Sequence, residues 1–129
     1  MKKRINNYRI FFILGILTVL MVSCDPTLDL TDIRDPLEGS WTCIETGAQS
    51  YQVNVSKAPL EEDKMYFNNL YNLKTNVEVI ISGNTLKIPS QTTANFTLKG
   101  SGTVLNNKRT INLSFTADDD AVEATMTKN

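Results

Sequence analysis

Histidine is missing from this 129-residue chain, and cysteine occurs only at Cys24 and Cys43. Without an imidazole, a Ser-His-Asp or Cys-His catalytic couple and the histidine-containing zinc sites are excluded. A glycine-rich phosphate loop is missing as well, because strand-like residues, not a helix, follow Gly100-Ser101-Gly102. We therefore expect a non-catalytic protein that needs no cofactor and no metal ion.

Basic residues are scarce outside the N-terminal segment. Lys2, Lys3, Arg4 and Arg9 are four of the 13 Lys and Arg residues, so that nine basic residues face 14 acidic residues in the rest of the chain. A nucleic-acid-binding protein usually presents a surplus of positive charge to the phosphate backbone. Nucleic acid is therefore not an expected partner.

The first 23 residues have the pattern of a secretory signal peptide. A basic start, Lys2-Lys3-Arg4, precedes an apolar run over 10–22, which is shorter than the about 20 residues of a membrane span. The run leads into Leu20-Met21-Val22-Ser23-Cys24, which resembles a bacterial lipobox, although Met21 stands where leucine is usual. The resemblance implies acylation of Cys24 and a lipid anchor in the cell envelope, with the outer membrane as the expected location and the domain facing the periplasm or the exterior. The alternatives are an uncleaved anchor and an ordinary signal peptide with a chance cysteine.

Residues 24–36 are expected to be the lipidated cysteine and a flexible tether, because four Asp and two Pro lie between Asp25 and Pro36. With Cys24 acylated, Cys43 has no partner for an intramolecular disulfide. We interpret Cys43 as a small buried residue on a strand, since no histidine exists to activate its thiol.

Apolar and polar residues alternate from residue 37 onward, as is typical of strands with one buried face. Strands are predicted over 40–46, 51–57, 64–70, 76–82, 84–88, 94–100, 109–116 and 121–127, with turns at 82–84, 89–90, 100–102, 106–108 and 118–120. A helical turn after Pro59 is an alternative at the start of the third strand. The predicted fold class is all-β, a small antiparallel up-and-down barrel of about eight strands, with a β-sandwich as the alternative.

Gly39-Ser40-Trp41, at the start of the first predicted strand, resembles the G-x-W element of lipocalins and other calycins. The patterns over 83–91 and 96–102 are similar to the calycin-like domains of small lipoproteins common in Bacteroides and its relatives, and the resemblance covers residues 37–129. It implies that Gly39 and Trp41 close one end of the barrel, with Lys128 as the cation over the Trp ring. The T-D-Y element of lipocalins is missing.

The expected function is a binding module for a small apolar or sugar-like ligand, whose contact residues the sequence does not reveal. The alternative is an interaction or envelope-structural lipoprotein, which includes an inhibitor.

Acidic pairs for glycoside hydrolysis could come from Glu45, Glu78 or Glu123, but nothing in the sequence sets their separation. The acidic clusters at 61–63 and 118–120 are interpreted as solvated turns, because adjacent carboxylates point in different directions. The barrel interior is expected to be filled by Trp41, Tyr51, Tyr66, Phe67, Phe96 and Phe115, and Tyr71 is expected to be exposed.

Overall fold

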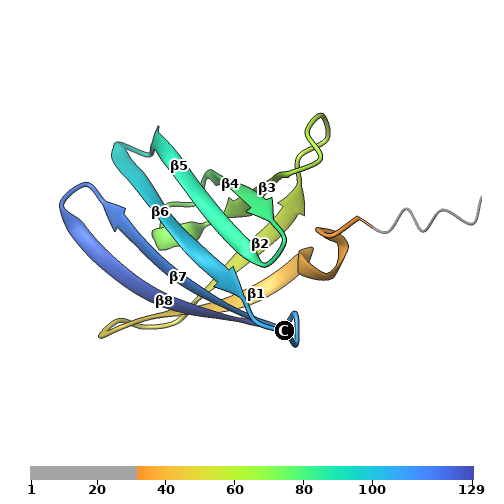
Figure 1. Cartoon of the computed structure of the whole chain (residues 1–129). Helices are drawn as coiled ribbons and strands as arrows, with labels where there is room; N and C mark the ends of the chain where they lie inside the picture. The colour runs from red at the N-terminus through yellow and green to blue at the C-terminus, as the bar shows by residue number, and fades with distance from the viewer. Residues whose placement is uncertain (1–31) are drawn as a thin grey trace, which may run out of the picture. The chain divides into compact units, whose positions relative to one another are not determined.

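The computed structural model describes residues 32–129, which form a closed barrel (Figure 1). Each strand pairs antiparallel with the next strand in sequence, and the last strand pairs with the first to close the barrel. The strands are β1 (Gly39–Glu45), β2 (Tyr51–Lys57), β3 (Lys64–Asn68), β4 (Asn76–Ser82), β5 (Thr85–Thr93), β6 (Phe96–Val104), β7 (Thr110–Ala117) and β8 (Asp120–Lys128). The predicted all-β up-and-down barrel is thus confirmed, and the sandwich alternative is wrong.

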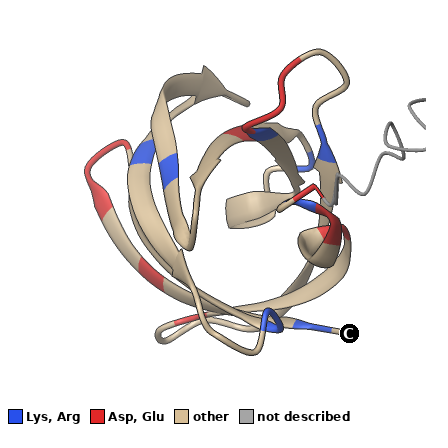
Figure 2. Ribbon diagram, turned by 45° about the vertical axis from the view of Figure 1, so that its right-hand side comes forward, with Lys and Arg blue, Asp and Glu red and all other residues tan. Residues whose placement is uncertain are grey.

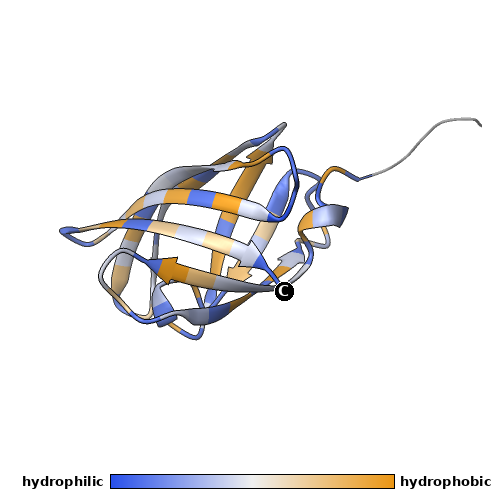
Figure 3. Cartoon of the chain, turned by 90° about the horizontal axis from the view of Figure 1, so that it is seen from below, coloured by the Kyte–Doolittle hydropathy of each residue, from blue (hydrophilic) through white to orange (hydrophobic). Residues whose placement is uncertain are grey.

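Alternation along each strand produces the core, because successive side chains point to opposite faces of the sheet. In β7, Ile111, Leu113 and Phe115 are buried, whereas Asn112 and Ser114 face solvent. Figure 3 shows this alternation as changes between apolar and polar colours along the strands. The inward side chains of all eight strands belong to one buried cluster, so the middle of the barrel is filled by side chains.

The barrel has two ends, which we name by the segments that form them. The entry end carries residues 32–38, the β2–β3 loop and the β4–β5 and β6–β7 turns, and the far end carries the β1–β2 hairpin, the β3–β4 connection and the β5–β6 and β7–β8 turns. A short 3₁₀ helix lies at each end, η2 (Asp35–Leu37) at the entry end and η3 (Leu70–Asn72) at the far end. Leu37 and Leu70 are buried in the core cluster, so each helix covers its end of the barrel (Figure 2).

Two predicted turns are wrong, because both lie inside strands. β5 continues through Pro89-Ser90 to Thr93, with a shift in the β5–β6 register between Ile88 and Gln91. Such a bulge accepts a proline, which has no N–H to contribute to the ladder. Likewise β6 continues through Gly100-Ser101-Gly102 to Val104.

Gly100 and Gly102 face inward where β6 passes very close to β7. A Cβ atom at Gly100 would lie 2.4 Å from the Cβ of Phe115, and one at Gly102 would lie 2.5 Å from Leu113 Cδ2. Glycine is therefore required by the close approach of the two strands, and the pair does not mark a turn.

The structure corrects further predictions near the core. The third strand ends at Asn68, Tyr66 lies on the outer face between Ser56 and Glu78, and Tyr71 packs against the core.

The folded unit includes residues 32–36, which the sequence analysis assigned to the tether. Arg34 is 7% exposed, and its guanidinium binds the β2–β3 loop. The signal peptide 1–23, Cys24 and the rest of the tether lie outside the described residues.

Candidate functional site

The entry end brings together the three residues that the sequence predicts to close the barrel, namely Gly39, Trp41 and Lys128. Trp41 is 0% exposed, and its Nε1 donates a 2.8 Å hydrogen bond to the carbonyl of Leu37. Lys128 lies opposite Trp41 in the β1–β8 register, and its ammonium donates to the Pro36 carbonyl at 2.5 Å. Gly39 has a φ of 130°, a conformation that favours glycine. These contacts attach residues 36–37 to the strands that close the barrel.

A second cluster, which the sequence analysis missed, surrounds Arg34. Its guanidinium donates to the carbonyls of Ala58, Glu61 and Lys64 at 3.2, 2.7 and 2.9 Å, and to the carboxylate of Asp32. The hydrogen bonds from Arg34 lower the pKa of Asp32 to about 2. Arg34 thereby attaches the N-terminal segment to the β2–β3 loop. In the sequence, Arg34 stands out only as the single basic residue in the acidic segment 25–36.

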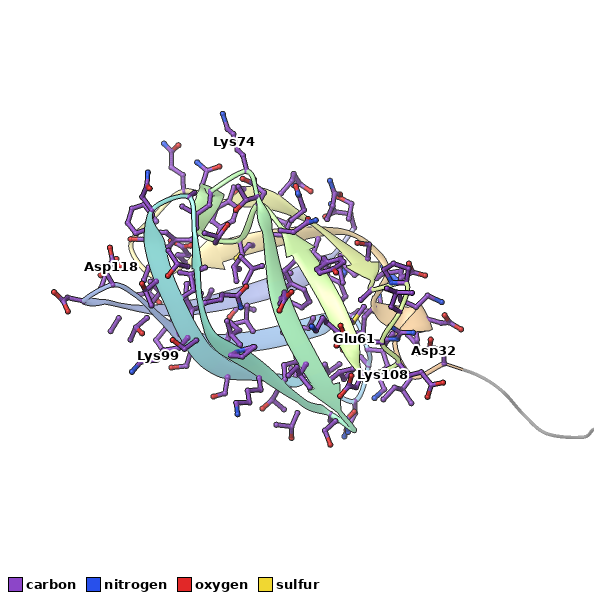
Figure 4. All side chains as sticks on the ribbon, turned by 90° about the horizontal axis from the view of Figure 1, so that it is seen from above. Asp32, Glu61, Lys74, Lys99, Lys108 and Asp118 are labelled. Carbon is purple, nitrogen blue, oxygen red and sulfur yellow. The ribbon has the colours of Figure 1, made fainter. Side chains whose placement is uncertain are left out.

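A pocket of about 310 Å³ opens at the entry end between η2 and the β4–β5 and β6–β7 turns. This volume is at the lower limit of typical small-ligand pockets, which begin at about 300 Å³. We call it the entry-end pocket, and it is lined by the apolar side chains of Ile33, Pro36, Leu37, Ile81 and Val104 together with Asp32, Gly83, Asn84 and Lys108. Lys108 donates to Asn84 Oδ1, so the polar side chains at the pocket are already held in position. The pocket can therefore accept a small apolar group. Figure 4 shows Asp32 and Lys108 at this end of the barrel.

Tyr71 closes the far end in a strained backbone conformation. Its φ is 56°, and Asn69, Asn72 and Lys74 in the same connection also have positive φ values. The amide of Tyr71 donates to the Tyr51 hydroxyl at 2.9 Å, and its ring packs edge-on against Phe96 and Phe115. Tyr71 was expected to be exposed, but its ring completes the aromatic core at this end.

Tyr51 connects this closure to Cys43. The Tyr51 hydroxyl donates to Glu45 Oε1 at 2.5 Å and accepts from the Cys43 thiol, whose sulfur lies 3.4 Å away. Burial raises the pKa of Tyr51 and raises that of Cys43 to about 11. The Cys43 thiol is therefore protonated at neutral pH and is a poor nucleophile.

Acidic side chains gather outside this closure. Glu45, Asp120 and Glu123 line a cleft of about 560 Å³ beside Tyr71, whereas Glu78 lies elsewhere, 3.5 Å from Lys64. The structure thus brings two of the three candidate glycosidase acids, Glu45 and Glu123, to one cleft.

Within residues 32–129, no group of three or more Cys, Asp and Glu side chains is arranged to hold a metal ion. None of the helices in that range has the length and apolar character to cross a membrane.

A closed barrel of eight antiparallel strands is consistent with a calycin-like fold. Comparison of the chain with protein-family models, curated proteins and solved structures gave no match. Functional assignment therefore rests on the residues and geometry of the chain itself.

Proposed function

We propose that this protein is a lipid-anchored, non-catalytic binding module that takes a small apolar ligand into the entry-end pocket. The observation that supports the proposal is the pocket itself, which has an apolar lining and a volume of about 310 Å³. Its lining favours an apolar ligand over a sugar-like one, because a saccharide would leave most of its hydroxyl groups without hydrogen-bond partners.

The lining of the entry-end pocket is held in place by contacts on several sides. The bond from Trp41 Nε1 fixes the carbonyl of Leu37, and Lys128 fixes that of Pro36. Arg34 binds three carbonyls of the β2–β3 segment. A site held in this way loses little conformational freedom when a ligand binds, which favours affinity.

Lipid anchoring rests on the lipobox-like sequence that ends at Cys24. The described residues begin at Asp32, which lines the entry-end pocket. The intervening residues span at most about 30 Å when fully extended. An acylated Cys24 would therefore keep the entry end, with its apolar pocket, close to the membrane surface.

Native mass spectrometry tests the ligand. A fragment consisting of residues 25–129 would be incubated with an envelope extract of the source organism and then ionised under gentle conditions. We expect a small-molecule adduct that is lost on denaturation. Ile33→Gln should weaken the adduct, because Ile33 lines the pocket. Ile44→Gln is the matched control, since the exposed fractions of Ile33 and Ile44 are 54% and 52% and Ile44 lies outside the pocket lining. An equal loss in both variants would contradict the assignment.

A protein partner at the entry end is the second candidate function. Leu60 is 93% exposed and Leu105 is 38% exposed, and both lie in connections at the same end as Ile33. Exposed apolar side chains at one end of a small domain are typical of an interaction surface. An adduct-free mass, together with a protein cross-link that Leu60→Gln removes, would favour this function over ligand binding.

A further inference from the structure

A shallow groove of about 560 Å³ lies on the outer wall of the barrel, across β5, β6, β7 and the start of β8. It shares no lining residue with the entry-end pocket. We call it the wall groove, and it is lined by Lys87, Ile88, Pro89, Ser90, Lys99, Gly100, Ser114, Phe115, Thr116 and Ala121. Figure 4 shows Lys99 on the side of the barrel, away from Asp32 and Lys108.

The two lysines of the groove lie near each other on adjacent strands. Lys87 is opposite Ser101 in the β5–β6 register, and Lys99 is two residues from Ser101 on the same outer face. Diagonal neighbours of this kind have Cα atoms about 7–8 Å apart, which long side chains bridge easily. Both ammonium groups can therefore reach a single bound group.

Neither ammonium group is neutralised by the folded domain. Within residues 32–129, Lys87 and Lys99 form no ion pair, whereas Lys57 pairs with Asp35 and Lys64 pairs with Glu61. Two unpaired lysines side by side repel each other, and an anion placed between them removes that repulsion. An anion that lies between Lys87 and Lys99 is therefore attracted by two neighbouring ammonium groups.

The shape of the groove follows from the irregularity of β5. Pro89 and Ser90 lie opposite Lys99 at the register shift, so that the ladder between β5 and β6 is interrupted beside the lysine. Pro89, Gly100 and Ala121 provide a low apolar floor, and the hydroxyls of Ser90 and Thr116 lie beside it. The Ser114 hydroxyl donates to Glu123 at 2.7 Å, so a carboxylate limits the groove on the β8 side.

We propose that the wall groove binds a carboxylate, phosphate or sulfate group carried on a small ring with an apolar face. The two ammonium groups would hold the anion, and the floor at Pro89 and Ala121 would contact the ring. Glu123 would repel an anion bound at the β8 side and thus orient the ligand toward β5 and β6. An anionic saccharide and the phosphoinositol headgroup of an anionic lipid both present this chemistry.

Titration of the full chain, in a non-ionic detergent, with phenyl phosphate tests the proposal. We expect binding of phenyl phosphate that is tighter than that of inorganic phosphate and of phenol, because both the anion and the ring make contacts. The double variant Lys87→Gln/Lys99→Gln should raise the dissociation constant at least tenfold. The matched control Lys74→Gln/Arg109→Gln removes two exposed basic side chains outside the groove, and should change the constant less than twofold.

The remaining outcomes would overturn the proposal. An equal loss of affinity in the two double variants would mean diffuse attraction by the whole surface. Equal affinity for inorganic and phenyl phosphate would remove the ring contact, and a failure of phenyl phosphate to bind at millimolar concentration would remove the site. A sugar phosphate and a short-chain phosphatidylinositol, titrated next, would distinguish the saccharide from the lipid source. Far-UV circular dichroism of both variants checks that the barrel is intact.

Discussion

The Tyr71 hydroxyl donates a 2.7 Å hydrogen bond to the carboxylate of Asp120, 49 residues further along the chain. This bond attaches η3 to the first residue of β8, while the Tyr71 amide is bound by Tyr51. A strained residue is kept only where its surroundings determine its position, and here both its amide and its side chain are held. The far end is therefore closed by tertiary contacts that oppose the local backbone preference.

Alkaline pH should destabilise the barrel through these tyrosines. The hydrogen bond to Asp120 raises the pKa of Tyr71 to about 12, and burial raises the pKa of Tyr51, from an ordinary value of 10.0. The unfolded chain therefore loses these protons at lower pH than the folded chain, so the free energy of unfolding falls as the pH rises from about 10 towards 12. Urea unfolding between pH 8 and 11 measures the effect. Tyr51→Phe/Tyr71→Phe should flatten the profile, and an unchanged profile in this double variant would contradict the role of the two tyrosines.

Arg34→Ala should destabilise the domain by about 2–4 kcal/mol, because it leaves carbonyls of the β2–β3 segment and the Asp32 carboxylate without their charged donor. Arg34→Lys should rescue this loss only in part, since a lysine cannot reproduce the forked geometry. The exposed Arg109→Ala is the control, with an expected change within about 0.5 kcal/mol. Chemical denaturation measures all three, and equal stability of Arg34→Ala and Arg109→Ala would contradict the role of Arg34.

The same cluster predicts a loss of stability in acid. Asp32 has a pKa of about 2 in the folded domain, against an ordinary value of 3.8. The ionised Asp32 carboxylate therefore adds to the free energy of unfolding above pH 3.8. This stabilisation is lost as the pH falls from about 4 towards 2. Asp32→Asn should reduce the slope of stability against pH in this range, and an unchanged slope would show that other carboxylates account for it.

Gly100→Ala should cost about 2–4 kcal/mol, because the new Cβ would lie 2.4 Å from both Phe115 Cβ and the Ser114 carbonyl, and the strands would have to separate. Ser101→Ala, at the neighbouring outward position, should change stability by no more than about 0.5 kcal/mol. Thermal unfolding of both variants measures the difference. Similar melting temperatures would mean that β6 and β7 are further apart than the structure shows.

The Gln91 side chain forms hydrogen bonds to β4 beyond the point where the backbone ladder between β4 and β5 ends. The backbone register of these strands covers Ile80 to Ser82 of β4, and beyond it the Gln91 side chain accepts from the Glu78 amide and donates to the Glu78 carbonyl, both at 2.8 Å. Gln91→Leu should cost about 1–3 kcal/mol, because two backbone groups lose their partners. Amide exchange at Glu78 should accelerate in this variant, and unchanged exchange would show that Gln91 is dispensable. Thr92→Ala is the control on the outer face.

Cys24→Ala tests the anchor. In a bacterial host, the wild-type chain should incorporate an alkyne fatty acid and fractionate with membranes, whereas the variant should do neither. Cys43→Ala is the matched control, because Cys43 is buried in the core and should be neither labelled nor needed for labelling. Persistent labelling of Cys24→Ala would overturn the proposed location.

Fold class and approximate strand positions follow from the sequence because the alternation of apolar and polar residues is local information. A strand that buries one face must show this period of two, so segments such as β2 and β4, over 51–57 and 76–82, have the predicted bounds. The inward position of Trp41 and its closeness to Lys128 likewise follow once the first and last strands pair.

The tertiary structure decided what depends on residues far apart in the chain. Pro89 and Gly100 have the local chemistry of turns, but the bulge in β5 and the close approach of β6 to β7 place them within strands. Arg34 became part of the domain because its acceptors are carbonyls more than 20 residues away. Both candidate ligand sites are likewise assembled from several strands and turns, and no single segment carries their pattern. Local periodicity thus determined the strands, whereas the closing of the barrel decided which side chains meet.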